Sequence, residues 1–188
     1  MVLNYSSYFG IEKKYLFSVV DYLIETQMED GGYNCLSTRK GAVHSSLHTT
    51  LSVLEGIYEF CKTGYNYRLD DIKRIEKECV EFILVHRLYK SDKTGKIIKD
   101  AFTRFPYPSR WKYDILRCLD YFAYSKVKYD ERMQDAIDLL ISKRKNDGKW
   151  VLAAKYPGEV HFSMEKAGRP SRWNTLRALR VLKHYNAI

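Results

Sequence analysis

Two identical tetrapeptides contain the residues of this chain whose types best suit ligand binding. Pro-Ser-Arg-Trp occurs at positions 108–111 and again at positions 170–173. An arginine guanidinium binds phosphate or carboxylate groups through its planar fork, and a tryptophan ring offers a π face to apolar or cationic groups. The candidate ligand contacts are Arg110 and Trp111 in the first copy, and Arg172 and Trp173 in the second.

The tetrapeptide also has a structural explanation that needs no ligand. A serine just before a helix accepts a hydrogen bond from the exposed amides of the first turn, and proline is tolerated at a helix start. Ser109 and Ser171 are therefore expected to cap two helices, with each tryptophan packed over the first turn. Helix capping fully explains the proline and the serine. Ligand contact is the alternative explanation for the arginine and the tryptophan.

A second group of residues has the types that bind zinc. His44, His48 and Glu55 are spaced so that a helix would place them roughly on one face, and histidines four residues apart can share a metal ion. The spacing matches no regular metal motif. Hydrogen-bonded side chains that line a polar cavity are the alternative interpretation, and zinc is the one cofactor that the sequence suggests.

Six amphipathic helices are expected to position these residues. Apolar side chains recur with a 3.6-residue period, for example at Leu16, Val20 and Leu23. Gly31 and Gly148 fit helix ends, because glycine accepts positive φ without steric cost. The predicted helices span residues 12–28, 45–62, 70–89, 110–125, 130–146 and 171–186.

The six helices are organised as three repeats of about sixty residues, each with a helix, a charged turn, a loop and a second helix. Leu51, Leu116 and Leu176 fall at one aligned position. The sequence therefore predicts an all-α protein in which residues 1–188 form a single helical-repeat domain. The repeats cover approximately residues 12–62, 70–125 and 130–186.

The charged turns resemble a known motif. Residues 27–33 read Gln-Met-Glu-Asp-Gly-Gly-Tyr, and residues 144–150 read Arg-Lys-Asn-Asp-Gly-Lys-Trp. Both resemble the QW repeat of squalene and triterpene cyclases, in which a glutamine is followed by a glycine and an aromatic residue. Over roughly residues 13–186 the chain thus resembles the α/α toroid superfamily of terpenoid cyclases and protein prenyltransferases, although the middle repeat keeps only Gly95 of the motif.

The resemblance implies an α/α toroid, a ring of helix pairs around a central cavity. A complete toroid of this superfamily has more than the six main helices expected here. The resemblance therefore implies a partial or half toroid, a fragment of a longer toroid, or a subunit completed by a protein partner or by self-association. The QW residues are structural in the family, where the glutamine ties helix ends and the aromatic ring covers a helix terminus. Their role fits the unpaired carbonyls that every helix C-terminus leaves.

The resemblance also implies that the second helix of each repeat lines the cavity. His48, Tyr113 and Trp173 share one aligned position on these helices, and Asp114 and Asn174 follow two of them. Aromatic rings with a few polar groups suit an elongated apolar ligand. Ordinary packing between helices explains the same column equally well.

The acidic signatures of the family's enzymes are missing, since the chain contains neither a DxDD motif nor a DDxxD motif. Catalysis is therefore left open. We expect a protein similar to prenyltransferases and terpene cyclases that binds an apolar or isoprenoid-type ligand in a central cavity. The alternative is a helical-repeat interaction module without enzymatic activity.

The composition bears on the partners and the cellular location of the protein. The formal net charge is +9, but the basic residues are spread over several segments, so we expect no nucleic-acid partner. Four cysteines without a CxxC pair are typical of reduced thiols in a cytosolic protein. The chain lacks a signal-peptide core and any run of about eighteen apolar residues, so a cytoplasmic protein without a transmembrane segment is expected.

Overall fold

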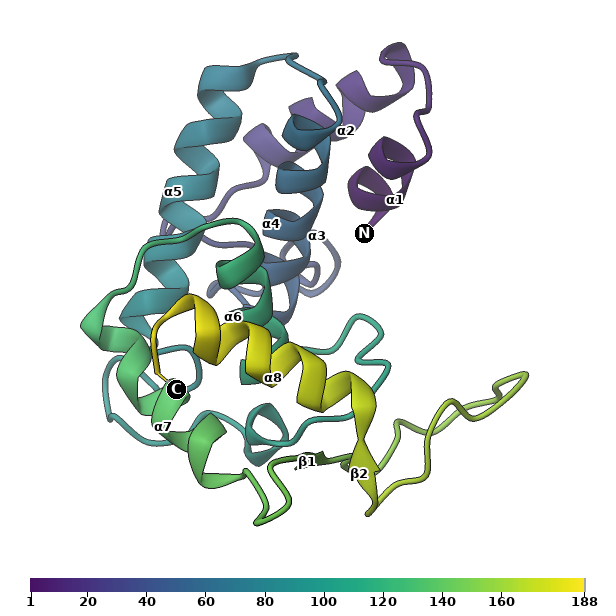
Figure 1. Ribbon diagram of the computed structural model, residues 1–188. Coiled ribbons are helices and arrows are strands. Elements are labelled where there is room, and N and C mark those ends of the chain that lie inside the picture. Colours follow the sequence, from purple (N-terminus) through teal and green to yellow (C-terminus); the bar gives the residue numbers. More distant parts are fainter. Residues whose placement is uncertain (188) are drawn as a thin grey trace. The chain divides into compact units, whose positions relative to one another are not determined.

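The computed structural model describes residues 1–187, and the chain divides into two compact units, Met1–Val85 and His86–Ile188. The described residues contain eight α-helices and one short two-stranded sheet, which confirms the prediction of a mostly helical protein (Figure 1). The arrangement of these helices into a toroid stays a prediction.

The first unit is built around one central helix. Helix α4 contacts both α1 and α5, and α2 contacts α1 and α5 in turn. Apolar residues of α4 recur every three or four positions, and Leu51, Leu54 and Ile57 are completely buried. The helices of this unit are α1 (Val2–Tyr8), α2 (Lys14–Glu25), α3 (Ser37–Lys40), α4 (Leu47–Lys62) and α5 (Leu69–Val85).

The second unit is built around two helices that run in the same direction. Helix α6 packs against α8, and contacts near their middles (Asp120 with Arg180) and beyond their C-terminal ends (Tyr185 with Val127) fix the common direction. The N-termini of α6 and α8 therefore lie at the same end of this unit. Its elements are η1 (Asp100–Thr103), α6 (Ile115–Tyr124), η2 (Glu131–Met133), α7 (Gln134–Ser142), β1 (Trp150–Val151), β2 (Pro170–Ser171) and α8 (Arg172–His184).

The two strands of the second unit form a small antiparallel sheet at the start of α8. Trp150 lies opposite Ser171, and Val151 lies opposite Pro170. The long loop between these strands extends away from the helices of its unit (Figure 1). The sheet thus fixes both ends of the loop next to the N-terminus of α8.

Each predicted helix has a counterpart in the structure, but the structural helices are shorter. The predicted helix 12–28 is α2, 45–62 is α4, 70–89 is α5, 110–125 is α6, 130–146 is α7 with η2, and 171–186 is α8. Helices α1 and α3 were not predicted. Both are short, and short segments provide too few turns to display a helical period.

The two Pro-Ser-Arg-Trp segments start their helices differently, which corrects one prediction. Ser171 caps α8 as expected, because its Oγ accepts from the backbone amide of Asn174 at 3.0 Å. Ser109 does not cap α6. The φ angle of Arg110 is +54°, which an α-helix excludes, and α6 begins at Ile115 with Asp114 as its cap.

Candidate ligand-binding site

The long loop between β1 and β2 contacts both Pro-Ser-Arg-Trp segments. Arg110 donates from Nη1 to the carbonyl oxygen of Pro157 at 3.3 Å. In the second segment, the amide of Arg172 donates to Glu165 at 2.7 Å, and the Arg172 Nε lies 3.5 Å from the same carboxylate. One loop therefore holds both of the arginines that the sequence singled out.

Glu165 also occupies the N-terminus of α8. Its side chain is only 8% exposed, and it accepts from Ser171 Oγ as well as from Arg172. Burial acts to raise the pKa of Glu165, but these hydrogen bonds hold the pKa below its ordinary value. Glu165 therefore occupies the amide of Arg172, and Ser171 Oγ occupies that of Asn174, so we expect side chains to hold an external anion near α8.

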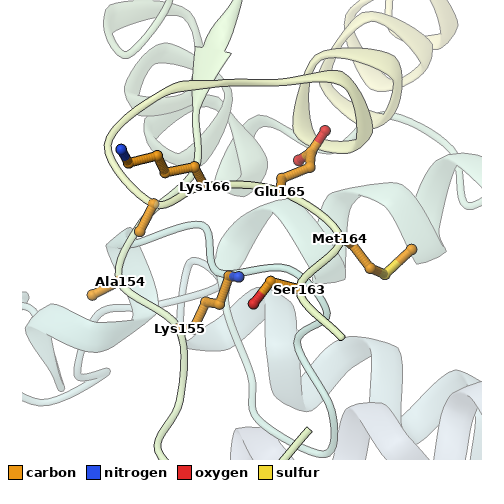
Figure 2. A pocket seen from close by; sticks show the side chains of 7 residues that line it. Ala154, Lys155, Ser163, Met164, Glu165 and Lys166 are labelled. Carbon is orange, nitrogen blue, oxygen red and sulfur yellow. The ribbon is translucent and has the colours of Figure 1, made fainter. Parts of the chain in front are cut away.

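The same loop forms an open hollow of about 560 Å³. Figure 2 shows that its lining comes from both limbs of the loop. The lining combines two basic side chains with small and apolar ones, and it consists of Ala154, Lys155, Ser163, Met164, Glu165, Lys166 and Ala167. Glu165 thus connects this pocket to the start of α8.

A second hollow of about 370 Å³ runs along α8. We call it the α8 groove, and it is lined by Lys149, Pro170, Arg172, Thr175, Leu176 and Leu179. Arg172 and Lys149 supply positive charge, and their side chains are 86% and 55% exposed. Leu176 is 56% exposed. The α8 groove therefore combines two accessible cations with an accessible apolar surface.

Aromatic rings surround the start of α8. Trp173 is 36% exposed and stacks on Tyr107, with the ring centroids 5.3 Å apart. The Arg177 guanidinium lies over the Tyr107 ring, 5.8 Å from its centroid. Arg177 also donates from Nε to Asp120 at 3.1 Å. The Trp173 side chain is thus held in place but remains accessible to a ligand.

Trp111, the other predicted tryptophan contact, is half exposed. The Lys112 ammonium lies 4.4 Å from the centroid of the Trp111 ring and 5.2 Å from that of Tyr156. These contacts join the first Pro-Ser-Arg-Trp segment to the long loop. Trp111 thus contacts a cation, whereas Trp173 stacks on a tyrosine ring.

Tyr113 and Asp114 are buried completely at the start of α6. The Tyr113 hydroxyl donates to the carbonyl of Leu88 at 2.6 Å, which accounts for its polar group within the core. Asp114 Oδ1 accepts from the amide of Arg117 at 2.9 Å. Burial raises the pKa of Asp114 to about 6, although the charge of Arg177 acts in the opposite direction. Asp114 is thus a fully buried carboxyl group that titrates near neutral pH.

Asn174 is the buried counterpart of Asp114 on α8. Both residues stand two positions ahead of the aligned leucines, Leu116 and Leu176. The Asn174 amide nitrogen donates to the carbonyl of Phe105 at 2.8 Å. The structure therefore brings the predicted residues Asp114 and Asn174 to the same end of the second unit.

The zinc candidates lie in the first unit. His44 is exposed and precedes α4, whereas His48 and Glu55 are half-buried within α4. Among residues 1–187, no group of three or more His, Cys, Asp and Glu side chains is placed to hold a metal ion. A zinc site at these three residues stays a prediction.

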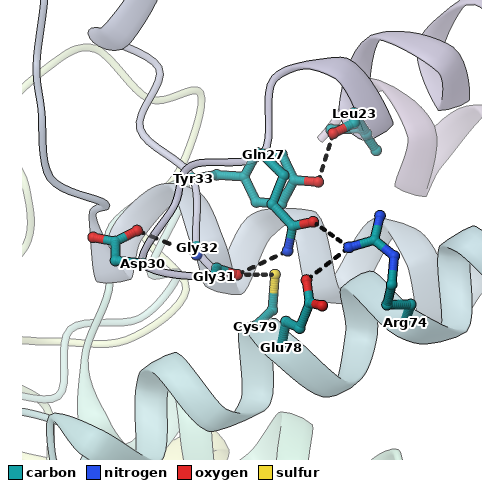
Figure 3. A network of polar contacts seen from close by, with 9 residues as sticks. All are labelled: Leu23, Gln27, Asp30, Gly31, Gly32, Tyr33, Arg74, Glu78 and Cys79. Atoms are coloured by element: carbon teal, nitrogen blue, oxygen red, sulfur yellow. Dashed lines mark hydrogen bonds and ion pairs between the residues drawn. The ribbon is translucent and has the colours of Figure 1, made fainter.

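The first QW-like turn is a network of hydrogen bonds (Figure 3). In the first unit, Gln27 donates from Nε2 to the carbonyl of Gly31 at 3.1 Å. The Tyr33 hydroxyl donates to the carbonyl of Leu23, in the last turn of α2, at 2.6 Å. Arg74 of α5 donates to Gln27 Oε1 at 3.1 Å, which ties the turn to a second helix.

The turn in the second unit repeats these contacts with different side chains. Arg144 donates from Nε to the carbonyl of Gly148 at 3.3 Å. The Trp150 indole donates to the carbonyl of Leu140, in α7, at 2.7 Å. An aromatic donor thus satisfies a carbonyl at the end of a helix in both units.

A threonine completes each turn. The amide of Tyr33 donates to Thr50 Oγ1 at 3.0 Å, and the amide of Trp150 donates to Thr175 Oγ1 at 3.1 Å. Thr50 and Thr175 each stand one position before an aligned leucine. The internal contacts therefore support the alignment of the first and third repeats.

Sequence reasoning missed several residues near the starts of α6 and α8, and two of them, Arg117 and Arg177, left a visible signal. Leu116-Arg117 and Leu176-Arg177 repeat the same dipeptide at the aligned position. Both arginines are nearly buried. Tyr156 and Glu165 left no such signal, because they belong to the long loop and their positions depend on how it returns to the sheet. Tyr107 precedes Pro108, and its contact with Trp173 is set by tertiary structure.

Comparisons of the chain with family models, curated protein sequences and solved structures gave no match. Within residues 1–187, no helix is both long and apolar enough to span a membrane.

Proposed function

We propose that the protein binds an amphiphilic ligand, with an anionic head group and an apolar tail of the isoprenoid type, at the α8 groove. The observation that carries this proposal is the pairing of two exposed cations, Arg172 and Lys149, with the apolar wall of Leu176 and Leu179. A guanidinium binds a diphosphate or carboxylate, and the leucines would cover the first part of the tail.

Within this proposal the three helix-pair repeats form a partial toroid of the terpenoid cyclase and prenyltransferase type. The matching networks at Gln27 and Arg144 support this arrangement, because both use an aromatic donor and a threonine to close a helix end. The proposal concerns binding. No catalytic step is included, because the chain lacks the acidic motifs of the enzymes that it resembles.

The test is a titration with farnesyl diphosphate and, separately, with farnesol. Arg172→Ala is expected to weaken diphosphate binding by about 1.5–3 kcal/mol, because it removes one charge-assisted contact. Binding of the uncharged alcohol should be unchanged. The stability of the variant should change little, since the Arg172 side chain is 86% exposed.

Lys183→Ala is the matched control. Lys183 is an exposed cation in the last turn of α8, and it does not line the α8 groove. This variant should bind both ligands as the wild type does. Equal loss of diphosphate binding in both variants would indicate a general effect of net charge, and would count against a site at Arg172.

An interaction module is the second candidate, and the first unit carries the observation that favours it. Large apolar side chains of its N-terminal region are exposed, including Tyr8 at 65%, Phe9 at 77% and Tyr15 at 60%. An apolar hollow of about 570 Å³ lies among α1, α2 and α4. Exposed apolar clusters of this kind mark interaction sites.

Sedimentation at increasing protein concentration tests this candidate. Self-association through the N-terminal region should weaken in a Phe9→Ser variant, because that change removes the most exposed aromatic ring of the cluster. A wild-type protein that stays monomeric at all concentrations would contradict self-association.

A further inference from the structure

The long loop between β1 and β2 ends in an apolar tip. We call residues 158–164 the loop tip, and in it Val160 is 56% exposed, Phe162 is 73% exposed and Met164 is 38% exposed. The loop extends away from the helices of its unit (Figure 1). A single exposed apolar side chain is ordinary on a protein surface, but a group of them on a projecting loop marks an interaction site.

Contacts on both limbs of the loop hold the tip in this position. On the first limb, Arg110 donates to the carbonyl of Pro157 at 3.3 Å. On the second limb, Glu165 accepts from the amide of Arg172 at 2.7 Å. The loop tip therefore begins and ends next to anchored residues.

Basic side chains lie beside the loop tip on both limbs. Lys155 and Lys166 line the open hollow of the loop together with Met164 of the tip (Figure 2). The carboxylate of Glu165 lines the same hollow, but it is 8% exposed and pairs with Arg172 at 3.5 Å. The surface next to the tip is therefore positively charged.

The second unit as a whole carries the positive charge of the chain. It holds 23 of the 32 Lys and Arg residues and 11 of the 23 Asp and Glu residues, which gives a formal net charge of +12. The remaining residues give the first unit a formal net charge of −3. Both units expose aromatic rings, such as Phe9 and Phe162, but the net charge of the second unit is the one that attracts anions.

The apolar tip and the cations together indicate the class of the partner. Nucleic acid would explain the charge, but its bases stack on aromatic rings and make little use of aliphatic side chains such as Val160 and Met164. A lipid bilayer uses both features, because acyl chains receive apolar side chains and anionic head groups attract lysine.

We propose that the loop tip inserts into the surface of a membrane that contains anionic lipid, with Lys155 and Lys166 at the head groups. Residues 158–164 form neither a helix nor a strand, so their backbone groups need water or head groups as partners. Insertion is therefore limited to the interface between head groups and acyl chains. The α8 groove takes no part in this contact.

Sedimentation with lipid vesicles tests the proposal. Wild-type protein should bind vesicles of phosphatidylcholine and phosphatidylserine at least about tenfold more tightly than vesicles of phosphatidylcholine alone, and added salt should weaken this binding. Equal binding to both kinds of vesicle, or no binding to either, would overturn the proposal. The vesicles contain no isoprenoid ligand, so the result is independent of the titration with farnesyl diphosphate.

Phe162→Ser tests the insertion of the tip. Binding to the mixed vesicles should weaken by about tenfold, because the substitution removes the largest apolar side chain of the tip. Phe9→Ser is the matched control, since Phe9 is 77% exposed and lies in the first unit, and it should bind as the wild type does. Equal losses in both variants would overturn the proposal, as would a lowered melting temperature of Phe162→Ser alone.

The double variant Lys155→Ala, Lys166→Ala tests the cations and should weaken binding by about tenfold at low salt. Lys126→Ala, Lys128→Ala is its control, with the same change of net charge. Lys126 and Lys128 are exposed and follow the C-terminus of α6, whereas the loop lies at the N-terminus of α8. Equal losses in the two double variants would indicate a general effect of net charge and would overturn the site.

Glu159→Gln tests the sign of the charge at the tip. Glu159 is an exposed acid of the loop tip, and it should be repelled by anionic head groups. The variant should bind the mixed vesicles severalfold more tightly than the wild type. Unchanged or weaker binding would contradict contact between the tip and the head groups.

Two further measurements identify a different occupant. A labelled single-stranded oligonucleotide that binds through Lys155 and Lys166, without any effect of Phe162→Ser, would assign the surface to nucleic acid and overturn the membrane proposal. Wild-type protein that self-associates without vesicles, in a way that Phe162→Ser abolishes, would assign the tip to a second copy of the chain and overturn it as well.

Discussion

The QW-like turns of the two units make equivalent hydrogen bonds with different side chains. In both turns a long side chain donates to the carbonyl of a glycine, and an aromatic ring donates to a helix-end carbonyl. The donors are glutamine and tyrosine in the first unit, and arginine and tryptophan in the second. The motif therefore depends on backbone acceptors at a helix end, which any donor of suitable reach can satisfy.

The turns differ in what they contact beyond these shared bonds. Gln27 also accepts from Arg74 of α5, so the first turn is joined to another helix. The Arg144 guanidinium instead lies over the Trp150 ring, 5.7 Å from its centroid. The second turn is thus stabilised mainly by its own aromatic residue, and the two turns should respond differently to substitution.

The largest effect is expected at Trp150. This ring is completely buried, and its indole donates to Leu140. Trp150→Ala should lower the free energy of unfolding by ~3–5 kcal/mol, because it leaves a cavity and removes the indole donor from the Leu140 carbonyl. Chemical denaturation measures this loss. Trp111→Ala is the control, since Trp111 is 50% exposed, and equal losses in both variants would contradict a special role for Trp150.

The next largest effect is a pH dependence of stability that arises in the second unit. Asp114 in the second unit has a pKa raised from 3.8 to about 6 by burial. Its neutral form is favoured in the folded protein, so its contribution to stability is present below about pH 3.8 and is lost as pH rises through about 6. The full loss corresponds to roughly 3 kcal/mol.

Asp114→Asn should remove this part of the pH dependence and raise stability at pH 7, because the amide keeps the cap without carrying charge. Urea denaturation between pH 4 and pH 8 provides the measurement. Parallel stability curves for wild type and variant would show that Asp114 does not titrate in this range.

A smaller difference in stability is expected between substitutions at Gly32 of the first turn and at Lys149, the corresponding residue of the second turn. A Cβ atom on Gly32 would lie 2.7 Å from the Cβ of Ser45 and 2.8 Å from Thr50 Oγ1. Gly32→Ala should therefore cost ~1–3 kcal/mol of stability through overpacking. Lys149→Ala should change stability by less than ~0.5 kcal/mol, as its side chain is 55% exposed. Similar melting temperatures for both variants would contradict the crowding at Gly32.

The sequence predicted the parts of the fold that depend on local patterns. Helix α8 and its Ser171 cap followed from the position of the serine before an apolar period. The same reasoning failed at Ser109, because Leu116 lies eight positions after Pro108, whereas Leu176 lies six after Pro170. The segment between the tetrapeptide and the aligned leucine is thus two residues longer in the first copy, and α6 starts correspondingly later.

The candidate site was predictable only where it depends on the repeat. Asp114 and Asn174 were found from their aligned positions, but sequence alone could not show that one oxygen of each is unpaired. Glu165 was missed because a loop carboxylate reaches α8 only after the small sheet has closed the loop. Contacts set by tertiary structure carry no periodic signal.

The smallest effect concerns Gln27 and Arg144, and it tests the difference between the turns most directly. Gln27→Ala removes the bond to Gly31 and the bond from Arg74, so it should cost ~1 kcal/mol. Arg144→Ala removes one long hydrogen bond of 3.3 Å and an exposed cation–π contact, so it should cost ~0.5 kcal/mol.

A double-mutant cycle measures how much of the effect of Gln27 depends on its hydrogen bond with Arg74. Gln27→Ala and Arg74→Ala should be non-additive by a few tenths of a kcal/mol or more, because the two side chains bond to each other. Arg74 is half exposed and also pairs with Glu78, so the coupling should remain below the cost of Gln27→Ala itself. Strict additivity would mean that Gln27 acts only within its own turn. The first turn would then depend on its own residues alone, as the second does.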